Sequence, residues 1–306
     1  MARVANATTP ETPYAGAPAT QPARATLAPS GVAPRGLRAS LLGRRGLGGL
    51  ALPISIVVLL VVWEGYVAMA RPPSYILPAP SRIGQALVNG LSKGLDDRSG
   101  YWLHLVSTLR GALSGYVLGC SAGILLGVLI AEFRVLERIL LPYAVGLQSL
   151  PKVAIAPLIL IWFGFGPTSK MVLAALLTFF PLLINSYVGL SLVDRDYILL
   201  MRSLGASRLQ VLRKVKMPGA LPMIFAGLDM SSVYAVLGAI VAEFVGSDAG
   251  IGVMIIQAQF QNDTASVFAA LVVLAIVGIL LHTLVQTVGH RLVFWTRVQD
   301  QIRVTS

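Results

Sequence analysis

Apolar runs of eighteen or more residues recur along this chain, and they restrict its possible folds more than any other feature. A helix of roughly 20 apolar residues crosses a bilayer, so repeated runs of that length predict several membrane-spanning helices. Only 12% of the residues are charged, about half of what a soluble domain carries. The short alternating segments of a transmembrane β-barrel are absent from the sequence. The sequence therefore predicts an all-α polytopic membrane protein.

Six spans of suitable length can be drawn. They are expected at Leu50–Met69, Ser107–Ala131, Ile139–Phe163, Met171–Leu190, Pro222–Val245 and Ser266–Gly289. Residues 1–49 are rich in Ala, Pro, Thr and Gly, which predicts a disordered cytoplasmic tail before one membrane domain over 50–306. The small residues around Ala68 resemble a signal-peptide cleavage site, but the long segment before the first run and Glu64 within it favour a retained helix.

Lysines and arginines predict which side of the membrane each loop faces. Seventeen fall in the tail, the 132–138 turn, the 192–221 loop and the C-terminal end, against five on the opposite side. Cytoplasmic loops hold the excess of basic residues, so both termini are expected to be cytoplasmic. The net charge of +11 therefore gives no reason to expect a nucleic-acid partner.

Glycines spaced four residues apart run along the second span. They are Gly111, Gly115, Gly119, Gly123 and Gly127. In lipid, small residues at this spacing let another helix approach closely. Packing inside one chain is favoured over a seam between two subunits.

Two external segments are predicted to be short structural elements. Ser81 can cap a helix whose Ile83 and Leu87 share one face. The turn Gly246–Gly252 follows Glu243 and is rich in glycine. Such a turn can cradle an anion, but a structural re-entry of the chain is favoured.

The third span contains three prolines and a lysine. Pro142, Pro151 and Pro157 interrupt it, and Lys152 lies near its middle. Proline frees backbone carbonyls, which is tolerated where a helix faces protein or a water-filled path. A charge at that depth is costly and is a functional candidate, although Lys152 could also snorkel or lie at a wet cytoplasmic vestibule. We take Pro151, Lys152, Pro157 and Glu243 as candidate residues of a translocation path.

The remaining polar residues in the spans suggest no catalysis. They are Glu64, Arg110, Asn185, Asp229, Glu243 and His282, and they form no metal-binding or proton-relay pattern. The phosphate-binding Gly-x-x-x-x-Gly-Lys sequence is also absent. We therefore expect no enzyme activity, no ATPase site and no cofactor bound by this chain.

The 192–221 loop is polar and basic, with helical periodicity on both sides of one glycine. Asp194 can cap a first helix in which Tyr197, Leu200, Met201 and Leu204 share a face. The next residue, at position 205, is a glycine, as a helix end in the left-handed conformation requires.

A second helix is expected after that glycine. Ser207 can cap it, with Leu209, Leu212 and Val215 inward, and Pro218 marks the approach to the fifth span. The loop could dock a partner protein, or lie on the membrane with its basic side chains at lipid headgroups.

The loop resembles the signature of permease subunits of binding-protein-dependent ABC importers, written E-A-A-x3-G-x9-I-x-L-P. Here Gly205 is followed after nine residues by Val215 and then by Met217-Pro218. Further motifs are similar to those of the nitrate, sulfonate and taurine branch: Leu77-Pro78-Ala79-Pro80-Ser81, 150–158, Trp162-Phe163-Gly164, Leu204-Gly205-Ala206-Ser207, Ala242-Glu243 and Gly250-Ile251-Gly252. The resemblance covers about residues 50 to 295.

This resemblance implies a type I ABC importer permease fold in the bacterial cytoplasmic (inner) membrane. Two such subunits, most simply a homodimer, would form the path, and a periplasmic binding protein would deliver substrate. Two cytoplasmic ATPases, which bind ATP and Mg²⁺, would dock on the loop. The implied coupling residues are Asp194, Arg195, Tyr197, Leu200, Met201, Arg202, Leu204, Gly205, Ala206, Ser207 and Pro218.

One position departs from the family pattern. The E-A-A residues fall on Leu199-Leu200-Met201, so the acid is missing and its polar anchor to the ATPase is in doubt. The expected substrate is a small anion such as a sulfonate, nitrate or an organic acid. The alternatives are a secondary transporter or channel-like protein without ATP, which would be expected to show inverted repeats and paired intramembrane charges.

Overall fold

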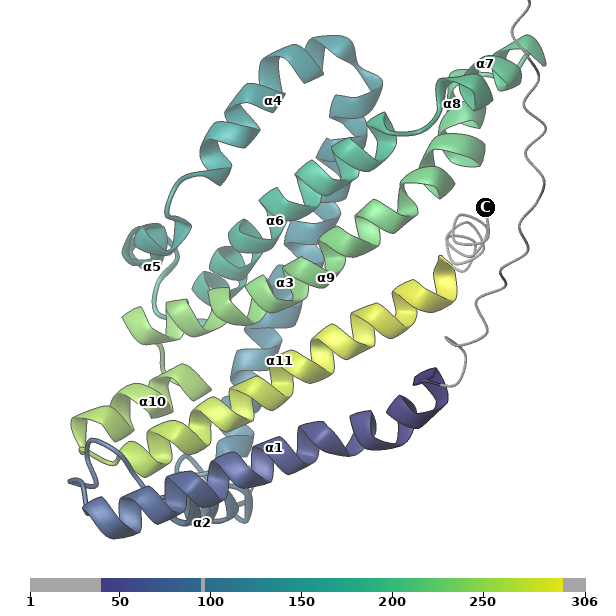
Figure 1. Ribbon diagram of the computed structural model, residues 1–306. Coiled ribbons are helices and arrows are strands. Elements are labelled where there is room, and N and C mark those ends of the chain that lie inside the picture. Colours follow the sequence, from purple (N-terminus) through teal and green to yellow (C-terminus); the bar gives the residue numbers. More distant parts are fainter. Residues whose placement is uncertain (1–39, 95–96, 294–306) are drawn as a thin grey trace, which may run out of the picture. The chain divides into compact units, whose positions relative to one another are not determined.

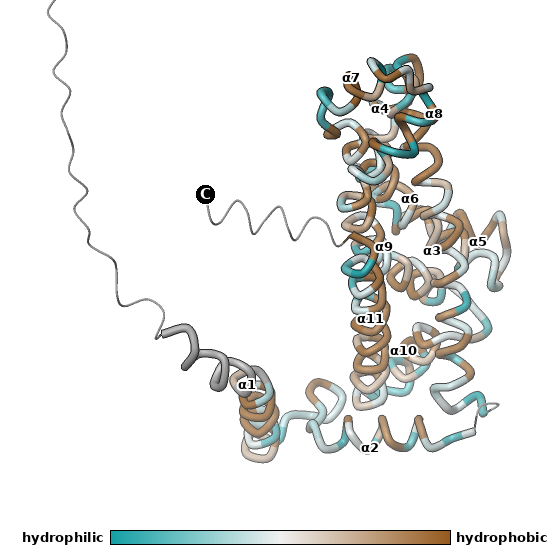
Figure 2. The backbone as a smooth tube through the Cα atoms, turned by 90° about the vertical axis from the view of Figure 1, so that its right-hand side faces the viewer, coloured by the Kyte–Doolittle hydropathy of each residue, from teal (hydrophilic) through white to brown (hydrophobic). Residues whose placement is uncertain are grey.

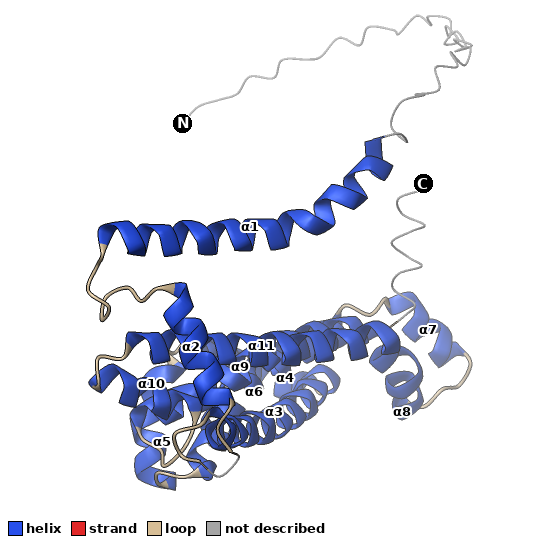
Figure 3. Ribbon diagram, turned by 90° about the horizontal axis from the view of Figure 1, so that it is seen from below, coloured by secondary structure: helices blue, strands red, loops and turns tan. Residues whose placement is uncertain are grey.

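The computed structural model describes residues 40–94 and 97–293, with backbone alone for 40–50 and 52. In these ranges the regular structure is helical, as Figure 3 shows. The helices are α1 (Ser40–Ala70), α2 (Pro80–Leu91), α3 (Tyr101–Glu132), α4 (Arg134–Gln148), η1 (Lys152–Ile155), α5 (Ala156–Phe163), α6 (Pro167–Ser191), α7 (Arg195–Ser203), α8 (Arg208–Val211), η2 (Leu212–Lys216), α9 (Met217–Val245), α10 (Ile251–Phe260) and α11 (Thr264–Leu292).

Five helices of the described chain are long and apolar enough to cross a membrane. They are Pro53–Ala70 of α1, then α3, α6, the continuous helix Arg208–Val245, and α11. These confirm five of the predicted spans. The remaining span, Ile139–Phe163, is not one straight helix, because α4 and the following η1–α5 segment meet at an angle of 86°.

Only one of the three prolines in that span lies at the bend. Pro142 is inside α4 and Pro157 is in the first turn of α5, where a missing N–H costs nothing. Pro151 immediately precedes η1, in the short break between the helices. The prediction that all three prolines break the span was therefore wrong for Pro142 and Pro157.

The described chain divides into two units at residue 56, within α1. Residues 40–49 of the predicted tail are helical, and residues 1–39 lie outside the described chain. In the second unit, Trp63 packs edge-to-face on Phe268 of α11, with ring centroids 5.8 Å apart. The C-terminal part of α1 is thereby attached to α11.

Glu64, the acidic residue of the first span, binds the start of α2. Its carboxylate accepts hydrogen bonds from the Ser81 amide at 3.0 Å and the Ser81 hydroxyl at 2.8 Å. These contacts satisfy the free N-terminus of α2, which begins at Pro80 after the N-cap residue Ala79. The prediction of Ser81 as the cap was wrong by two residues, since the cap is supplied by Glu64 from another helix.

The glycine row of α3 packs against α6 of the same chain. A Cβ added at Gly115 would lie 2.4 Å from Ala174 Cβ, and one at Gly119 would lie 2.3 Å from the Ala175 carbonyl oxygen. Gly111, Gly123 and Gly127 meet α6 in the same way. This confirms the predicted packing inside one chain, and Figure 1 shows α3, α6 and α9 running side by side.

Replacing Gly119 by alanine is expected to lower the thermal stability of the detergent-solubilised protein. The added methyl group would force α3 from the α6 backbone, and overpacking of this kind costs about 1–3 kcal/mol. Gly278→Ala in α11 is the matched control, because its Cβ would meet nothing within 4 Å. Equal melting temperatures for the two variants would contradict the close α3–α6 approach.

Figure 2 shows how hydropathy follows the fold. Brown, apolar residues predominate along α11, while teal residues gather around α7 and α8. Large apolar side chains such as Ile279, Leu280 and Leu284 are exposed on α11. This is the surface required of a helix that faces lipid or another membrane subunit.

Candidate functional site

The first helix of the 192–221 loop begins and ends as its sequence predicts. The Asp194 side chain accepts a hydrogen bond from the Asp196 amide at 3.0 Å, which caps α7. At the other end Gly205 has φ +78°, and its amide donates to the Arg202 carbonyl while the Ala206 amide donates to that of Met201. These two bonds are the Schellman arrangement.

The second helix begins with a reciprocal cap. The Gln210 amide donates to the Ser207 hydroxyl at 3.4 Å, and the Ser207 amide donates to the Gln210 side chain at 2.7 Å. The predicted cap at Ser207 is confirmed. Of the residues predicted to face inward, Leu212 packs against a core cluster and Val215 is half-buried, whereas Leu209 is exposed and Val211 is buried in its place.

A π-helical turn, η2, joins α8 to α9 without a break. The Met217 amide donates to the carbonyl of Leu212, five residues back, and Pro218 follows directly. Proline clashes with the carbonyl four residues before it, and a wider turn at this point relieves that clash. Pro218 therefore lies within one helix of 38 residues rather than at the start of a separate span.

A groove opens between α7 and the η2–α9 segment, and we call it the hairpin groove. Its cavity volume is about 500 Å³. Tyr197, Leu200 and Met201 of α7 line one side, and Lys214, Val215 and Gly219 line the other. Asp194, which caps α7, also lines the groove, so the structure brings four of the predicted coupling residues together at one surface.

The other predicted coupling residues lie around this groove. Arg195, Arg202, Leu204, Gly205 and Ser207 are exposed, while Ala206 and Pro218 are half-buried. The nearby Lys216 pairs with Glu132 of α3 at 2.5 Å. That ion pair attaches the base of the hairpin to the end of α3.

Lys152 lies at the bend between α4 and α5. Its ammonium donates to the Gln148 carbonyl at 2.7 Å and lies 5.0 Å from the centroid of the Phe180 ring. The side chain is half-buried, and the flanking Pro151 and Pro157 are exposed. Three of the four predicted path residues therefore share one bend, but Glu243 lies elsewhere.

Glu243 is buried in a polar network that the sequence did not predict. Its carboxylate lies 3.0 Å from the Lys170 ammonium and accepts hydrogen bonds from the Thr108 hydroxyl at 2.8 Å and the Gly252 amide at 2.9 Å. The side chains of Lys170 and Glu243 are only 3% and 0% exposed. This buried ion pair and its hydrogen bonds join residues of α3, α6, α9 and α10.

The glycine-rich turn supplies part of this network. The Gly250 amide donates to His104 Nδ1 at 2.9 Å, and the Ile251 amide donates to the Thr108 hydroxyl at 2.9 Å. A Cβ at Gly250 would lie 2.0 Å from the Glu243 carboxyl carbon. The anion held by this turn is therefore the carboxylate of Glu243, which agrees with a structural re-entry.

A second pair of titratable side chains meets between α9 and α11. His282 Nδ1 lies 2.6 Å from one carboxylate oxygen of Asp229, and the Gln286 side chain donates to the other at 3.4 Å. Both residues stand out in the sequence as polar residues in apolar spans. Nothing local to either one predicts that they face each other.

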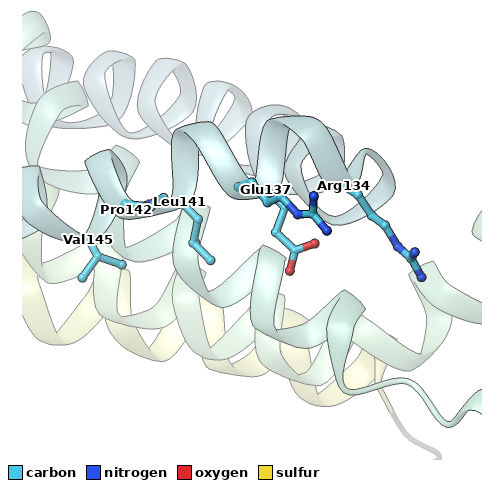
Figure 4. A pocket seen from close by; sticks show the side chains of 6 residues that line it. Arg134, Glu137, Leu141, Pro142 and Val145 are labelled. Atoms are coloured by element: carbon cyan, nitrogen blue, oxygen red, sulfur yellow. The ribbon is translucent and has the colours of Figure 1, made fainter.

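A further groove, of about 620 Å³, runs along α4. Figure 4 shows its lining residues spaced along one helix, with Arg134 and Glu137 toward one end and Pro142 and Val145 toward the other. The Glu137 carboxylate accepts a hydrogen bond from the Tyr187 hydroxyl at 2.7 Å. No predicted site residue lines this groove.

Comparisons with known proteins agree on one kind of protein. The family described as "Binding-protein-dependent transport system inner membrane component" matches residues 123–294. The riboflavin transport system permease protein RibX of Chloroflexus aurantiacus is 38% identical over 246 residues, which cover 80% of this chain and 90% of that protein. The putative aliphatic sulfonates transport permease protein SsuC of Bacillus subtilis is 33% identical over 260 residues, covering 83% and 90%.

A solved structure shares the fold. The MetNI methionine ABC transporter, in an inward-facing conformation, superposes with a TM-score of 0.52 at 20% identity. The match covers 68% of this chain and 96% of that chain. At this identity the likeness describes the helix arrangement and nothing about the substrate.

Proposed function

Because the chain belongs to the family of binding-protein-dependent transport system inner membrane components and is a permease subunit of an ABC importer, we propose that two copies form the substrate path and that the 192–221 hairpin couples them to two ATPase subunits. ATP and Mg²⁺ are held by those ATPases. A periplasmic binding protein delivers substrate to the external end, in the bacterial cytoplasmic membrane. The observation that carries the proposal is the hairpin itself, which is capped, ordered and exposed.

The coupling follows from the continuity of one helix. Arg208–Val245 runs from the hairpin into the packed helices through a π turn. A helix transmits displacement along its axis, whereas a flexible linker would absorb it. Closure of the ATPase pair would therefore move α9 as a rigid element and bias the path toward its outward-open state.

The path is proposed to pass the bend between α4 and α5. Lys152 presents a cation there, next to exposed Pro151 and Pro157. The carboxylate oxygens of Glu243 accept hydrogen bonds from Thr108 and Gly252 of the same chain. Its proposed role is to shape the external end of the path, without contact with the substrate.

The substrate is proposed to be a small anion such as a sulfonate, nitrate or an organic acid. Lys152 favours this class, because a cation in a membrane path attracts anions and repels other cations. The relative named for aliphatic sulfonates agrees with it, while the relative named for riboflavin suggests a planar heterocycle as the second candidate.

A secondary transporter is the rival that the structure makes more plausible than the sequence did. Paired intramembrane charges were expected of that class, and Lys170–Glu243 is such a pair. Family membership nevertheless favours an ATP-driven importer. The tight burial of Lys170 and Glu243 is also what a structural anchor requires.

Reconstitution tests the proposal. The chain is co-expressed with the ATPase and binding protein of the same import system and placed in liposomes. ATP-dependent uptake of labelled taurine is expected, and Lys152→Ala is expected to reduce it about tenfold, as for the loss of roughly 1.4 kcal/mol. Lys152→Arg keeps the charge and is the control.

Three outcomes would contradict parts of the proposal. Uptake driven by an ion gradient without ATP would identify a secondary transporter. Riboflavin uptake without anion uptake would reverse the substrate class. Unchanged anion uptake by Lys152→Ala would exclude a contact between Lys152 and the substrate.

A further inference from the structure

The hairpin groove has an apolar floor. Leu200, Met201, Val215 and Gly219 line it, and its other lining residues are Val193, Asp194, Tyr197 and Lys214. The exposed fraction of the Leu200 side chain is 57%. An apolar surface of this kind, surrounded by polar groups, marks a place where another molecule binds.

The length of the continuous helix points to a soluble occupant rather than lipid. From Val245 back to Gly219 and Lys214 there are 26 to 31 residues, or about 39–46 Å of helix at a rise of 1.5 Å per residue. The hydrocarbon core of a bilayer is about 30 Å thick. The groove therefore lies farther from Val245 along the helix than the hydrocarbon core is thick, which favours a position outside the hydrocarbon.

The net charge of the hairpin indicates what kind of surface fits it. Within the described residues, the side chains of Arg195, Arg202, Arg208, Arg213 and Lys214 have no ion pair or hydrogen bond, whereas Lys216 is paired with Glu132. These cations outnumber the hairpin's two acids, Asp194 and Asp196, so the hairpin as a whole complements an apolar side chain flanked by carboxylates.

Two neighbouring leucines show why the lost family acid matters little here. Leu199 and Leu200 are almost equally exposed, at 59% and 57%, but only Leu200 lines the groove. Leu199 takes the position of the acid in the E-A-A pattern and lies outside the groove. The face of α7 at Leu199 therefore lacks the family's acidic contact, whereas the face at Leu200 forms part of the apolar hairpin groove.

We infer that the hairpin groove receives an apolar side chain of the ATPase subunit, with acidic residues of the ATPase facing the surrounding arginines. This inference rests on the proposed function, in which the hairpin docks an ATPase. It assigns the docking energy to Leu200, Met201 and Val215 rather than to a salt bridge at position 199. Burial of one large apolar side chain contributes about 1.5–3 kcal/mol, which corresponds to at least a tenfold change in the affinity for the ATPase.

The test compares Leu200→Glu with Leu199→Glu. Each variant is co-expressed with the ATPase of the same import system, purified in lipid nanodiscs, and titrated with that ATPase. Leu200→Glu is expected to weaken binding at least tenfold, because a carboxylate then occupies the apolar floor. Leu199→Glu is expected to bind within twofold of the unchanged chain, and both variants should elute as the unchanged chain does in size-exclusion chromatography, since both side chains are exposed.

A fluorescent probe separates the ATPase from lipid. An environment-sensitive dye on Leu200→Cys is expected to change its emission when the ATPase is added in zwitterionic nanodiscs. The same change produced by phosphatidylglycerol alone would overturn the inference in favour of lipid headgroups.

The titrations also distinguish the inference from the proposed function. If the unchanged chain does not bind the ATPase, the proposed function fails. If it binds and Leu200→Glu binds equally well, the inference alone is overturned. If Leu199→Glu loses binding as strongly as Leu200→Glu, the groove has no special role and the inference is overturned as well.

Discussion

Replacing Glu243 by glutamine is expected to destabilise the protein so strongly that little folded protein accumulates in the membrane. Glutamine keeps the shape of the side chain but leaves the Lys170 ammonium buried without a counter-charge. Removing one partner of a buried ion pair costs about 3–5 kcal/mol, and typical proteins have a total stability of only about 5–15 kcal/mol. The measurement is the yield of monodisperse protein and its melting temperature in detergent.

Two controls make this result specific. Glu132→Gln breaks the other Lys–Glu pair, whose side chains are 17% and 20% exposed, and partly solvated pairs contribute about 0–1 kcal/mol. The double variant Lys170→Met with Glu243→Gln is expected to recover part of the stability, because it leaves no unpaired charge. Equal yields for Glu243→Gln and Glu132→Gln would show that the buried network is not an anchor.

Replacing Gly205 by valine is expected to separate ATP hydrolysis from uptake while leaving the chain assembled. Gly205 has φ +78°, a conformation that costs a side-chain residue about 1–2 kcal/mol and more for a β-branched one. A Cβ there would meet nothing within 4 Å, so the effect is conformational and local to the turn between α7 and α8. Uptake is expected to fall at least tenfold, with ATPase activity no longer stimulated by the loaded binding protein.

Other substitutions at the same position extend this test. Gly205→Asn is the control, because asparagine tolerates the left-handed conformation and should retain coupling. Gly205→Pro also removes the amide that donates to Arg202 and should behave like valine. Normal transport by Gly205→Val would disprove the coupling role of the turn.

Much of the hairpin could be predicted from sequence, because its signals are short in range. The caps at Asp194 and Ser207 and the left-handed Gly205 depend on residues no more than five positions away. The π turn before Pro218 was missed, since the prolines suggested the start of a separate helix. The same local argument placed a cap at Ser81, where the structure uses Glu64 from another helix.

The buried network could not be predicted in this way. Lys170 and Glu243 are 73 residues apart in the sequence, and each alone has the character of a charge near a helix end. Only the close approach of α9 to α6 brings the carboxylate to the lysine, and it depends on Gly238, where an added Cβ would lie 2.6 Å from Ala174 Cα. The Asp229–His282 contact depends in the same way on how α9 packs on α11.

The sequence by itself determined the class of fold, the positions of five spans, both ends of the first hairpin helix and the start of the second. Hydropathy, caps and turns follow from residues that are neighbours along the chain. Only the tertiary structure decided the 86° bend in the third span, the Lys170–Glu243 anchor and the groove beside Leu200. Each of these depends on which faces of distant helices meet, and the burial of a charge or the opening of a groove exists only after those faces have packed.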